Sequence, residues 1–126
     1  MTRVKAPEGG LSMNKLKVYI SIPIARYDYE AQKKIADKAK EWLERNSMEA
    51  VSPFENGLNK TALRHEHMQR DIQMLLECDA IMPIGSWQSS RGCKLEMEIA
   101  KQTDKTMILA PWAIDISKNI REELPF

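Results

Sequence analysis

Two carboxylates lie on helix faces that the sequence pattern otherwise reserves for apolar residues. Glu96 falls on the side of a predicted helix over residues 92–102 that is about 200° away from the solvated stripe containing Glu98. The other residues on the Glu96 side are Gly92, Cys93, Ile99 and Ala100. Asp71 repeats this pattern on the preceding helix, beside Met68, Ile72 and Leu75. Because a buried carboxylate is costly unless it faces a cavity or a partner, the pattern indicates two acids directed at such a feature.

Periodicity alone leaves a purely structural interpretation of both acids equally open. Each acid can lie at the edge of its helix, where its oxygens cap nearby backbone or pair with an arginine. The candidate arginines are Arg26, Arg64 and Arg91.

The loop between Gly85 and Gly92 favours a ligand site over that structural interpretation. It holds small residues, hydroxyls and an arginine directly before a helix start, where free backbone amides and the helix dipole accept a phosphate. Ser90 can equally be an ordinary N-cap. The loop matches neither a P-loop nor a dinucleotide GxGxxG motif, so we expect no ATP, NAD or other cofactor.

The chain that positions these residues alternates strands and helices. Strands are expected at 18–22, 48–51, 79–84 and 106–110, with helices after Asp28, around 63–77 and over 92–102. Right-handed crossovers then predict an α/β fold, a flavodoxin-like three-layer sandwich around a parallel sheet of four or five strands, the fifth near Ile114.

Ligands in such sheets bind at the carboxyl ends of the strands. The segments that follow the predicted strands are Ser21–Arg26, Pro53–Asn56 and Gly85–Gly92. We therefore expect these three segments to surround one crevice.

Length and composition predict one globular domain. The chain has 126 residues, and we expect residues 15–126 to form the domain and residues 1–14 to be a flexible tail. Nineteen basic and 18 acidic side chains leave a net charge of +1, so neither a nucleic-acid polymer nor a membrane surface is an expected partner. Two cysteines make no disulfide framework and no apolar run reaches the ~20 residues of a membrane helix, so we expect a cytoplasmic protein.

Metal ligands are not predicted. The side chains considered are His65, His67, Cys78 and Cys93. The H-x-H spacing on a helix directs the two imidazoles to different sides, and the chain has no C-x-x-C pair.

Several motifs spread over residues 17–110 together resemble the nucleoside 2-deoxyribosyltransferase superfamily. This superfamily includes the 2′-deoxynucleoside 5′-monophosphate N-hydrolases and a related domain family of unknown function. The matching residues are Tyr19 with Ile22-Pro23, Asp71, Asp79, and Gly92 with Glu96 and Ala100. Their order and spacing, rather than any single motif, carry the resemblance.

The resemblance implies cleavage of an N-glycosidic bond. Glu96 corresponds to the nucleophile that attacks the anomeric carbon and gives a glycosyl-enzyme with loss of the base. Asp71 corresponds to an aspartate that holds the substrate and assists proton transfer, and Tyr19 to a residue that orients the nucleophile. A buried strand aromatic is the alternative for Tyr19. The predicted phosphate- and substrate-binding residues are Ser90, Arg91, Gly92, Ser21, Ile22, Pro23, Arg26 and Trp87.

Ser90 favours one substrate class within this resemblance. At its position the deoxyribosyltransferases have an acid that binds a free 5′-hydroxyl, whereas the monophosphate hydrolases have a serine. An acid repels a phosphate, while a hydroxyl beside Arg91 and the amide of Gly92 binds one. We therefore predict hydrolysis of a (deoxy)nucleoside 5′-monophosphate to base and sugar phosphate, with base exchange by a nucleoside deoxyribosyltransferase as the alternative.

Ile22 departs from the family pattern, which commonly has glycine at this position. A branched side chain there leaves open a catalytically silent module that binds or senses a nucleotide. Members of the superfamily are oligomers with pockets completed by a neighbouring subunit, so the resemblance also implies a homodimer or higher homo-oligomer.

Overall fold

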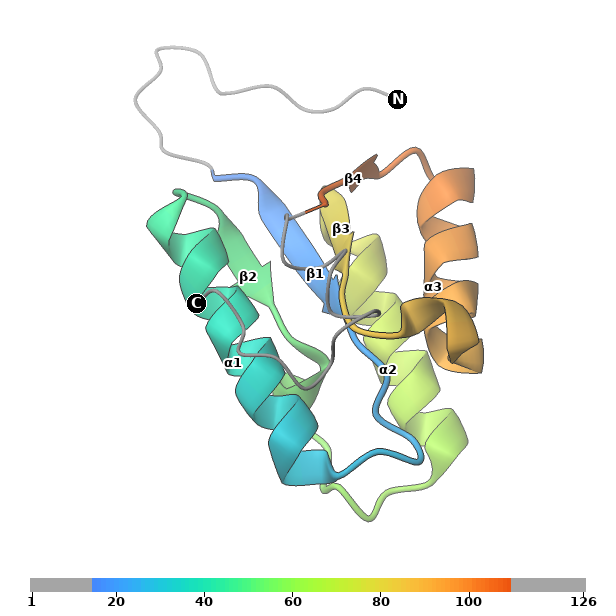
Figure 1. Cartoon of the computed structure of the whole chain (residues 1–126). Helices are drawn as coiled ribbons and strands as arrows, with labels where there is room; N and C mark the ends of the chain where they lie inside the picture. The colour runs from blue at the N-terminus through green and yellow to red at the C-terminus, as the bar shows by residue number, and fades with distance from the viewer. Residues whose placement is uncertain (1–14, 110–126) are drawn as a thin grey trace, which may run out of the picture.

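The computed structural model describes residues 15–109. Within them a four-stranded sheet is combined with three α-helices and two short 3-10 helices (Figure 1). The elements are β1 (Lys17–Ser21), α1 (Tyr29–Arg45), β2 (Glu49–Val51), η2 (Pro53–Glu55), α2 (Arg64–Leu76), β3 (Ala80–Pro83), η3 (Trp87–Ser89), α3 (Arg91–Gln102) and β4 (Thr106–Met107). The strand order is β2-β1-β3-β4, and every neighbouring pair is parallel.

The side chains of β1 alternate between the two faces of this sheet. Val18 and Ile20 pack against α1 in one apolar cluster, whereas Tyr19 packs in a second cluster with residues of α2 and α3. Because alternate residues of a strand share a face, Ser21 lies on the same side as Tyr19. Figure 1 accordingly shows α1 on one side of the sheet and α2 and α3 on the other. The predicted flavodoxin-like three-layer sandwich with a parallel sheet is confirmed.

Side-chain caps define the starts of two helices. Asp28 Oδ2 accepts a hydrogen bond from the Ala31 backbone N–H at 2.8 Å before α1. Ser90 Oγ accepts one from the Cys93 backbone N–H at 3.2 Å before α3. Such caps satisfy amides that have no partner inside the helix, and each contributes about 1 kcal/mol. Asp28 is therefore the cap that the sequence predicts, and Ser90 has the N-cap role that was its alternative interpretation.

The loop after β3 begins with a conformation that favours glycine. Gly85 has φ +71°, in the left-handed region, and a Cβ there would lie 3.5 Å from Pro23 Cδ. This turn leads the chain into η3 and then to the start of α3. A short 3-10 helix thus replaces part of the irregular loop that the sequence predicts.

The observed elements begin and end within one or two residues of most predicted bounds. The last strand is shorter than predicted, because β4 pairs with β3 only through Thr106 and Met107. The predicted tail over residues 1–14, the predicted fifth strand near Ile114 and the carboxyl end of the predicted domain lie outside the described residues.

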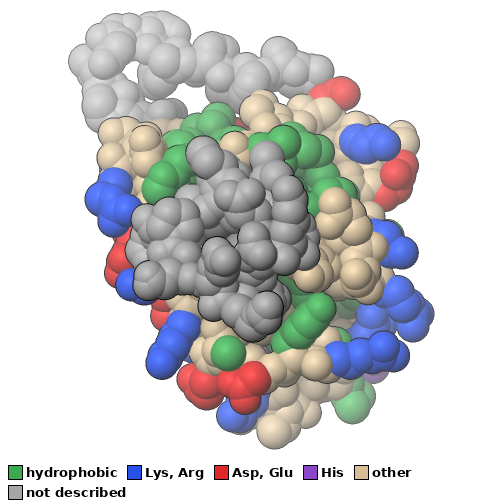
Figure 2. Space-filling model, viewed as in Figure 1, with side chains coloured by type: hydrophobic (Ala, Val, Ile, Leu, Met, Phe, Trp, Pro, Cys, Tyr) green, Lys and Arg blue, Asp and Glu red, His purple; other side chains and the backbone are tan. Residues whose placement is uncertain are grey.

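Charged side chains of both signs are interspersed on the face of the molecule shown in Figure 2. This distribution agrees with the net charge of +1. The helices within residues 15–109 include none with the length and apolar character needed to cross a membrane.

Candidate active site

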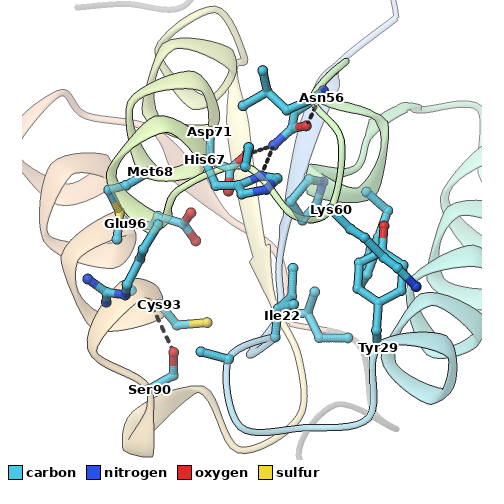
Figure 3. A pocket seen from close by; sticks show the side chains of 18 of the residues that line it. Ile22, Tyr29, Asn56, Lys60, His67, Met68, Asp71, Ser90, Cys93 and Glu96 are labelled. Atoms are coloured by element: carbon cyan, nitrogen blue, oxygen red, sulfur yellow. Dashed lines mark hydrogen bonds between the residues drawn. The ribbon is translucent and has the colours of Figure 1, made fainter.

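A cavity of about 340 Å³ lies at the carboxyl end of β1. Its walls come from the loop after β1, the start of α1, the η2 region, α2 and the first turns of α3 (Figure 3). The chain leaves the neighbouring strands β1 and β3 towards opposite faces of the sheet, and α/β proteins bind ligands at such a point. The volume falls within the range of small-molecule pockets. Of the predicted crevice segment Gly85–Gly92, the residues that line this cavity are Ser90 and Gly92.

Glu96 lines the cavity with both of its carboxylate oxygens held by hydroxyls. The Tyr19 hydroxyl donates to Oε2 at 2.9 Å, and the Ser21 hydroxyl donates to Oε1 at 2.7 Å. Both donors point at α3 because they are alternate residues of β1. The side chain is only 6% exposed, so the two hydrogen bonds give a buried acid one defined orientation.

Burial raises the pKa of Glu96 from 4.5 to about 7. The hydrogen bonds from Ser21 and Tyr19 oppose this shift because they stabilise the ionised form, and the charge of Asp71 adds to it. An ionised carboxylate in this position is held by neutral donors and is weakly solvated. It is therefore suited to attack a carbon that develops positive charge.

Asp71 reaches the same cavity from α2. Burial raises its pKa from 3.8 to about 6, and the hydrogen bond from Asn56 Nδ2 to Oδ1, 2.8 Å long, opposes that shift. A carboxyl group that exchanges its proton near neutral pH can act as a general acid and base. The cavity thus contains two carboxyl groups on different helices, both with raised pKa values.

Two other titratable groups at the cavity stay protonated. Burial, with the nearby Glu96 carboxylate, raises the pKa of Tyr19 well above 10, so its hydroxyl remains a donor to Glu96. Burial raises the pKa of Cys93 to about 11, so its thiol is a poor nucleophile at neutral pH. Within residues 15–109, His, Cys, Asp and Glu side chains form no group of three or more that could hold a metal ion.

The amino end of α3 borders the cavity through Ser90 and Gly92. Ser90 Oγ accepts the backbone N–H of Cys93, and its hydroxyl hydrogen can still donate to a ligand. Helix amides and the helix dipole favour an anion at this end.

The remaining predicted site residues divide between the cavity and its surroundings. Ile22 lines the cavity, yet its side chain is 5% exposed and packs in the apolar cluster beneath α1. The predicted residues absent from the cavity lining are Ser21, Pro23, Arg26, Trp87 and Arg91, although Ser21 donates to the lining residue Glu96. Of these, Arg26 and Arg91 are exposed on the surface.

The interpretation of both acids as edge residues is wrong. Glu96 accepts its hydrogen bonds from two buried side chains, and Asp71 accepts one from Asn56. Among the described residues no arginine forms an ion pair with either acid.

On the wall opposite α3, the sequence predicted the segment 53–56 at the crevice but missed Tyr29, Lys60 and Arg64. Tyr29 and Phe54 meet edge to face, with ring centroids 5.1 Å apart, and Lys60 Nζ lies 5.0 Å from the centroid of the Tyr29 ring. Arg64 also lines the cavity, and Asn56, the last residue of the predicted crevice segment 53–56, is a buried part of the lining. These residues come from separate segments, so no local motif marks them as one wall.

A parallel three-layer sandwich with a buried carboxylate in a cavity at its switch point defines a flavodoxin-like α/β protein with a cavity of small-molecule size. The chain belongs to the family described as Domain of unknown function (DUF4406), whose model matches residues 16–109. No curated protein matches the sequence.

The structure is similar to that of a 2-deoxyribosyltransferase from the psychrotolerant bacterium Bacillus psychrosaccharolyticus. The TM-score is 0.59 at 22% sequence identity, and the match covers 74% of this chain and 70% of the other. At this identity the likeness establishes a shared fold. The predicted resemblance is therefore confirmed for the fold and for membership of a domain family of unknown function, while the residue roles, self-association and cellular location stay predictions.

Proposed function

We propose that this protein breaks the N-glycosidic bond of a nucleoside-type substrate through a glycosyl ester on Glu96. The observation that carries this proposal is the buried Glu96 carboxylate in the cavity, with its oxygens 2.9 Å and 2.7 Å from the hydroxyls of Tyr19 and Ser21. Attack by an oriented carboxylate on the anomeric carbon divides the displacement at an oxocarbenium-like centre into two easier steps.

Asp71 supplies the second carboxyl group that the reaction needs. In its protonated form it donates a proton to the departing base, and in its ionised form it takes a proton from the group that attacks the ester. The reactive protein therefore has Glu96 ionised and Asp71 protonated. With pKa values of about 7 and about 6, this combination is a minor species at every pH.

The group that attacks the glycosyl ester distinguishes two activities. Attack by a second base gives exchange of one base for another, and the structural likeness to a 2-deoxyribosyltransferase supports this activity. Attack by water gives hydrolysis. Hydrolysis of a 5′-monophosphate is the second candidate, supported by Ser90 at the helix start and by Lys60 and Arg64 in the cavity lining.

The position of Ile22 supports a cavity that can hold a substrate. Its side chain packs into the core beneath α1, and a cavity of about 340 Å³ remains beside it. The branched side chain therefore leaves room for a ligand.

The decisive experiment measures base release from nucleosides and from their 5′-monophosphates, in ribo and deoxyribo forms. Each substrate is incubated with high enzyme, with and without a second free base, and the products are separated by chromatography. New nucleoside that requires the second base indicates exchange, and sugar or sugar phosphate without it indicates hydrolysis. Base release from none of the substrates refutes the proposal, and tight calorimetric binding without turnover identifies a silent module.

Two variants on α3 connect the activity with the proposed nucleophile. Glu96→Gln is expected to lower the rate by about a thousandfold or more, because it removes the attacking oxygen charge. Glu98→Gln is the matched control, since Glu98 is exposed on the other side of the same helix and binds Gln102.

A 2′-fluoro-arabino nucleoside, whose fluorine slows ester breakdown, should add one sugar to the Glu96 peptide in mass spectrometry.

A further inference from the structure

Asn56 stands at the centre of a buried hydrogen-bond network beside Asp71 (Figure 3). Its side chain is 3% exposed. The amide nitrogen Nδ2 donates to Asp71 Oδ1 at 2.8 Å and lies 3.1 Å from His67 Nδ1. The amide oxygen Oδ1 accepts the backbone N–H of Leu58 at 2.9 Å. One side chain thus joins the loop after η2 to two residues of α2.

Backbone groups at the two ends of this network determine its orientation. The Leu58 N–H can only donate, so the atom that faces it is the Asn56 oxygen, and the NH₂ group faces α2. An amide NH₂ group also only donates, so His67 Nδ1 accepts from it. The ring proton of His67 then lies on Nε2, which donates to the carbonyl oxygen of Asn59 at 3.1 Å. Both nitrogens of His67 are therefore occupied, and His67 is not the proton donor at this site.

Asp71 retains one carboxyl oxygen for proton exchange. Oδ1 accepts the Asn56 amide, whereas Oδ2 has no hydrogen-bond partner among residues 15–109. Because the hydrogen bond from Asn56 makes Oδ1 the less basic oxygen, a proton added to Asp71 favours Oδ2. Asp71 lines the cavity, so this proton is available to a ligand there.

We propose that Asn56 is a positioning residue: it donates a hydrogen bond to Oδ1 of Asp71 and thereby places the exchangeable proton on Oδ2. This inference rests on the proposed function. In the first step the Oδ2 proton moves to a nitrogen of the base as the C1′–N electron pair leaves with the base, and a Glu96 oxygen bonds to C1′. In the second step Oδ2 takes a proton from water or an acceptor base as that molecule bonds to C1′ and the Glu96 oxygen departs with its electron pair.

The same hydrogen bond affects the ionisation of Asp71. It stabilises the carboxylate and so lowers the pKa of Asp71 against the larger effect of burial. The charged and titratable groups around Asp71 are His67 and Arg70 on α2, Glu96 on α3 and Tyr19 on β1. Without the Asn56 donor, Asp71 should keep its proton to a pH about one unit higher.

Two substitutions test this role. Asn56→Asp keeps an oxygen for the Leu58 N–H but has no hydrogen to donate to Asp71. Asn56→Ala removes the whole group and does not add a charge. Asn59→Asp is the matched control, because it places the same charge in the same loop on an exposed side chain whose oxygen accepts only from Thr61 among the described residues.

The first readout is the ¹³Cγ chemical shift of Asp71 as a function of pH, which needs no enzymatic activity. We expect Asn56→Asp and Asn56→Ala to raise the titration midpoint by about one pH unit and Asn59→Asp to leave it unchanged. The second readout is the pH profile of kcat/KM, whose lower bend should move with the midpoint. A purely structural Asn56 would lower the melting temperature and move neither quantity.

The possible results separate this inference from the proposed function. A midpoint and a lower bend that stay at their wild-type values in a folded Asn56 variant overturn the inference. A midpoint that moves while the wild-type protein releases no base supports the control of Asp71 by Asn56 and refutes the proposed function.

Discussion

Replacement of Glu96 by glutamine should stabilise the fold, and the gain should grow with pH. Glutamine has the size of glutamate and can accept and donate hydrogen bonds at Tyr19 and Ser21, but it cannot ionise. In the wild-type protein the acid must lose its proton inside the core as the pH rises. The substitution removes that cost and also removes the proposed nucleophile.

The magnitude follows from the raised pKa of Glu96. Burial raises it from 4.5 to about 7, so between these values the folded state binds more protons than the unfolded state. Stability from this group is complete below about pH 4.5 and is lost as the pH rises through about 7. The total loss is about 3 kcal/mol, of which about 2 to 3 kcal/mol develops between pH 5 and pH 8.

Urea-induced unfolding followed by circular dichroism measures this effect. The free energy of unfolding is determined at pH 5 and pH 8 for the wild type, Glu96→Gln and the control Glu98→Gln. Relative to wild type, the stability of Glu96→Gln should increase by about 2 to 3 kcal/mol between these two pH values. The exposed control should show no comparable increase. A difference between Glu96→Gln and wild type that is the same at both pH values would refute the assignment of Glu96 as a buried, titrating acid.

Three further outcomes are expected. With a nucleoside substrate, kcat/KM should be nearly flat between pH 6 and pH 7 and fall about tenfold per unit outside this range, because the pKa values of Asp71 and Glu96 are about 6 and about 7; a rate that keeps rising above pH 8 would contradict the required protonation states. Tyr19→Phe removes a hydrogen-bond donor to Glu96, so it should move the upper bend of the kcat/KM profile to a pH about one unit higher and lower the plateau of kcat/KM about tenfold. An unshifted upper bend would show that the Tyr19 hydroxyl does not affect the pKa of Glu96. Gly85→Ala should cost about 1 kcal/mol in urea unfolding because φ is +71° there, and equal stability would count against a strained turn.

The sequence predicted the site best where a charged residue occupies a helix position that the periodic pattern assigns to the core. Asp71 and Glu96 stood out because a charged residue on the core-facing side of a helix has few explanations other than a cavity or a polar partner. The structure places both residues at the cavity. Arg26 and Arg91 were chosen for their charge, and they are exposed outside the cavity lining. Residue type indicates affinity for an anion, but a long, flexible side chain on a loop has no direction that a sequence pattern can reveal.

Asn56 illustrates the opposite case. In the sequence it stands out only as a turn residue at the end of a segment expected at the crevice, and its proposed role depends on His67 and Asp71 from another element. No periodicity links a loop to a helix face across the chain, so the contact exists only after α2 packs beside β1.

The sequence by itself determined the alternation of strands and helices, the parallel sheet and the two acids on core-facing helix sides, because these depend on local periods of two and 3.6 residues. Only the tertiary structure decided which groups meet those acids. The hydroxyls of Tyr19 and Ser21 reach Glu96, and the amide of Asn56 reaches Asp71, because the sheet brings β1 against α3 and the η2 loop against α2. The raised pKa values have the same origin, since burial results from the packing of all three layers and not from any one segment.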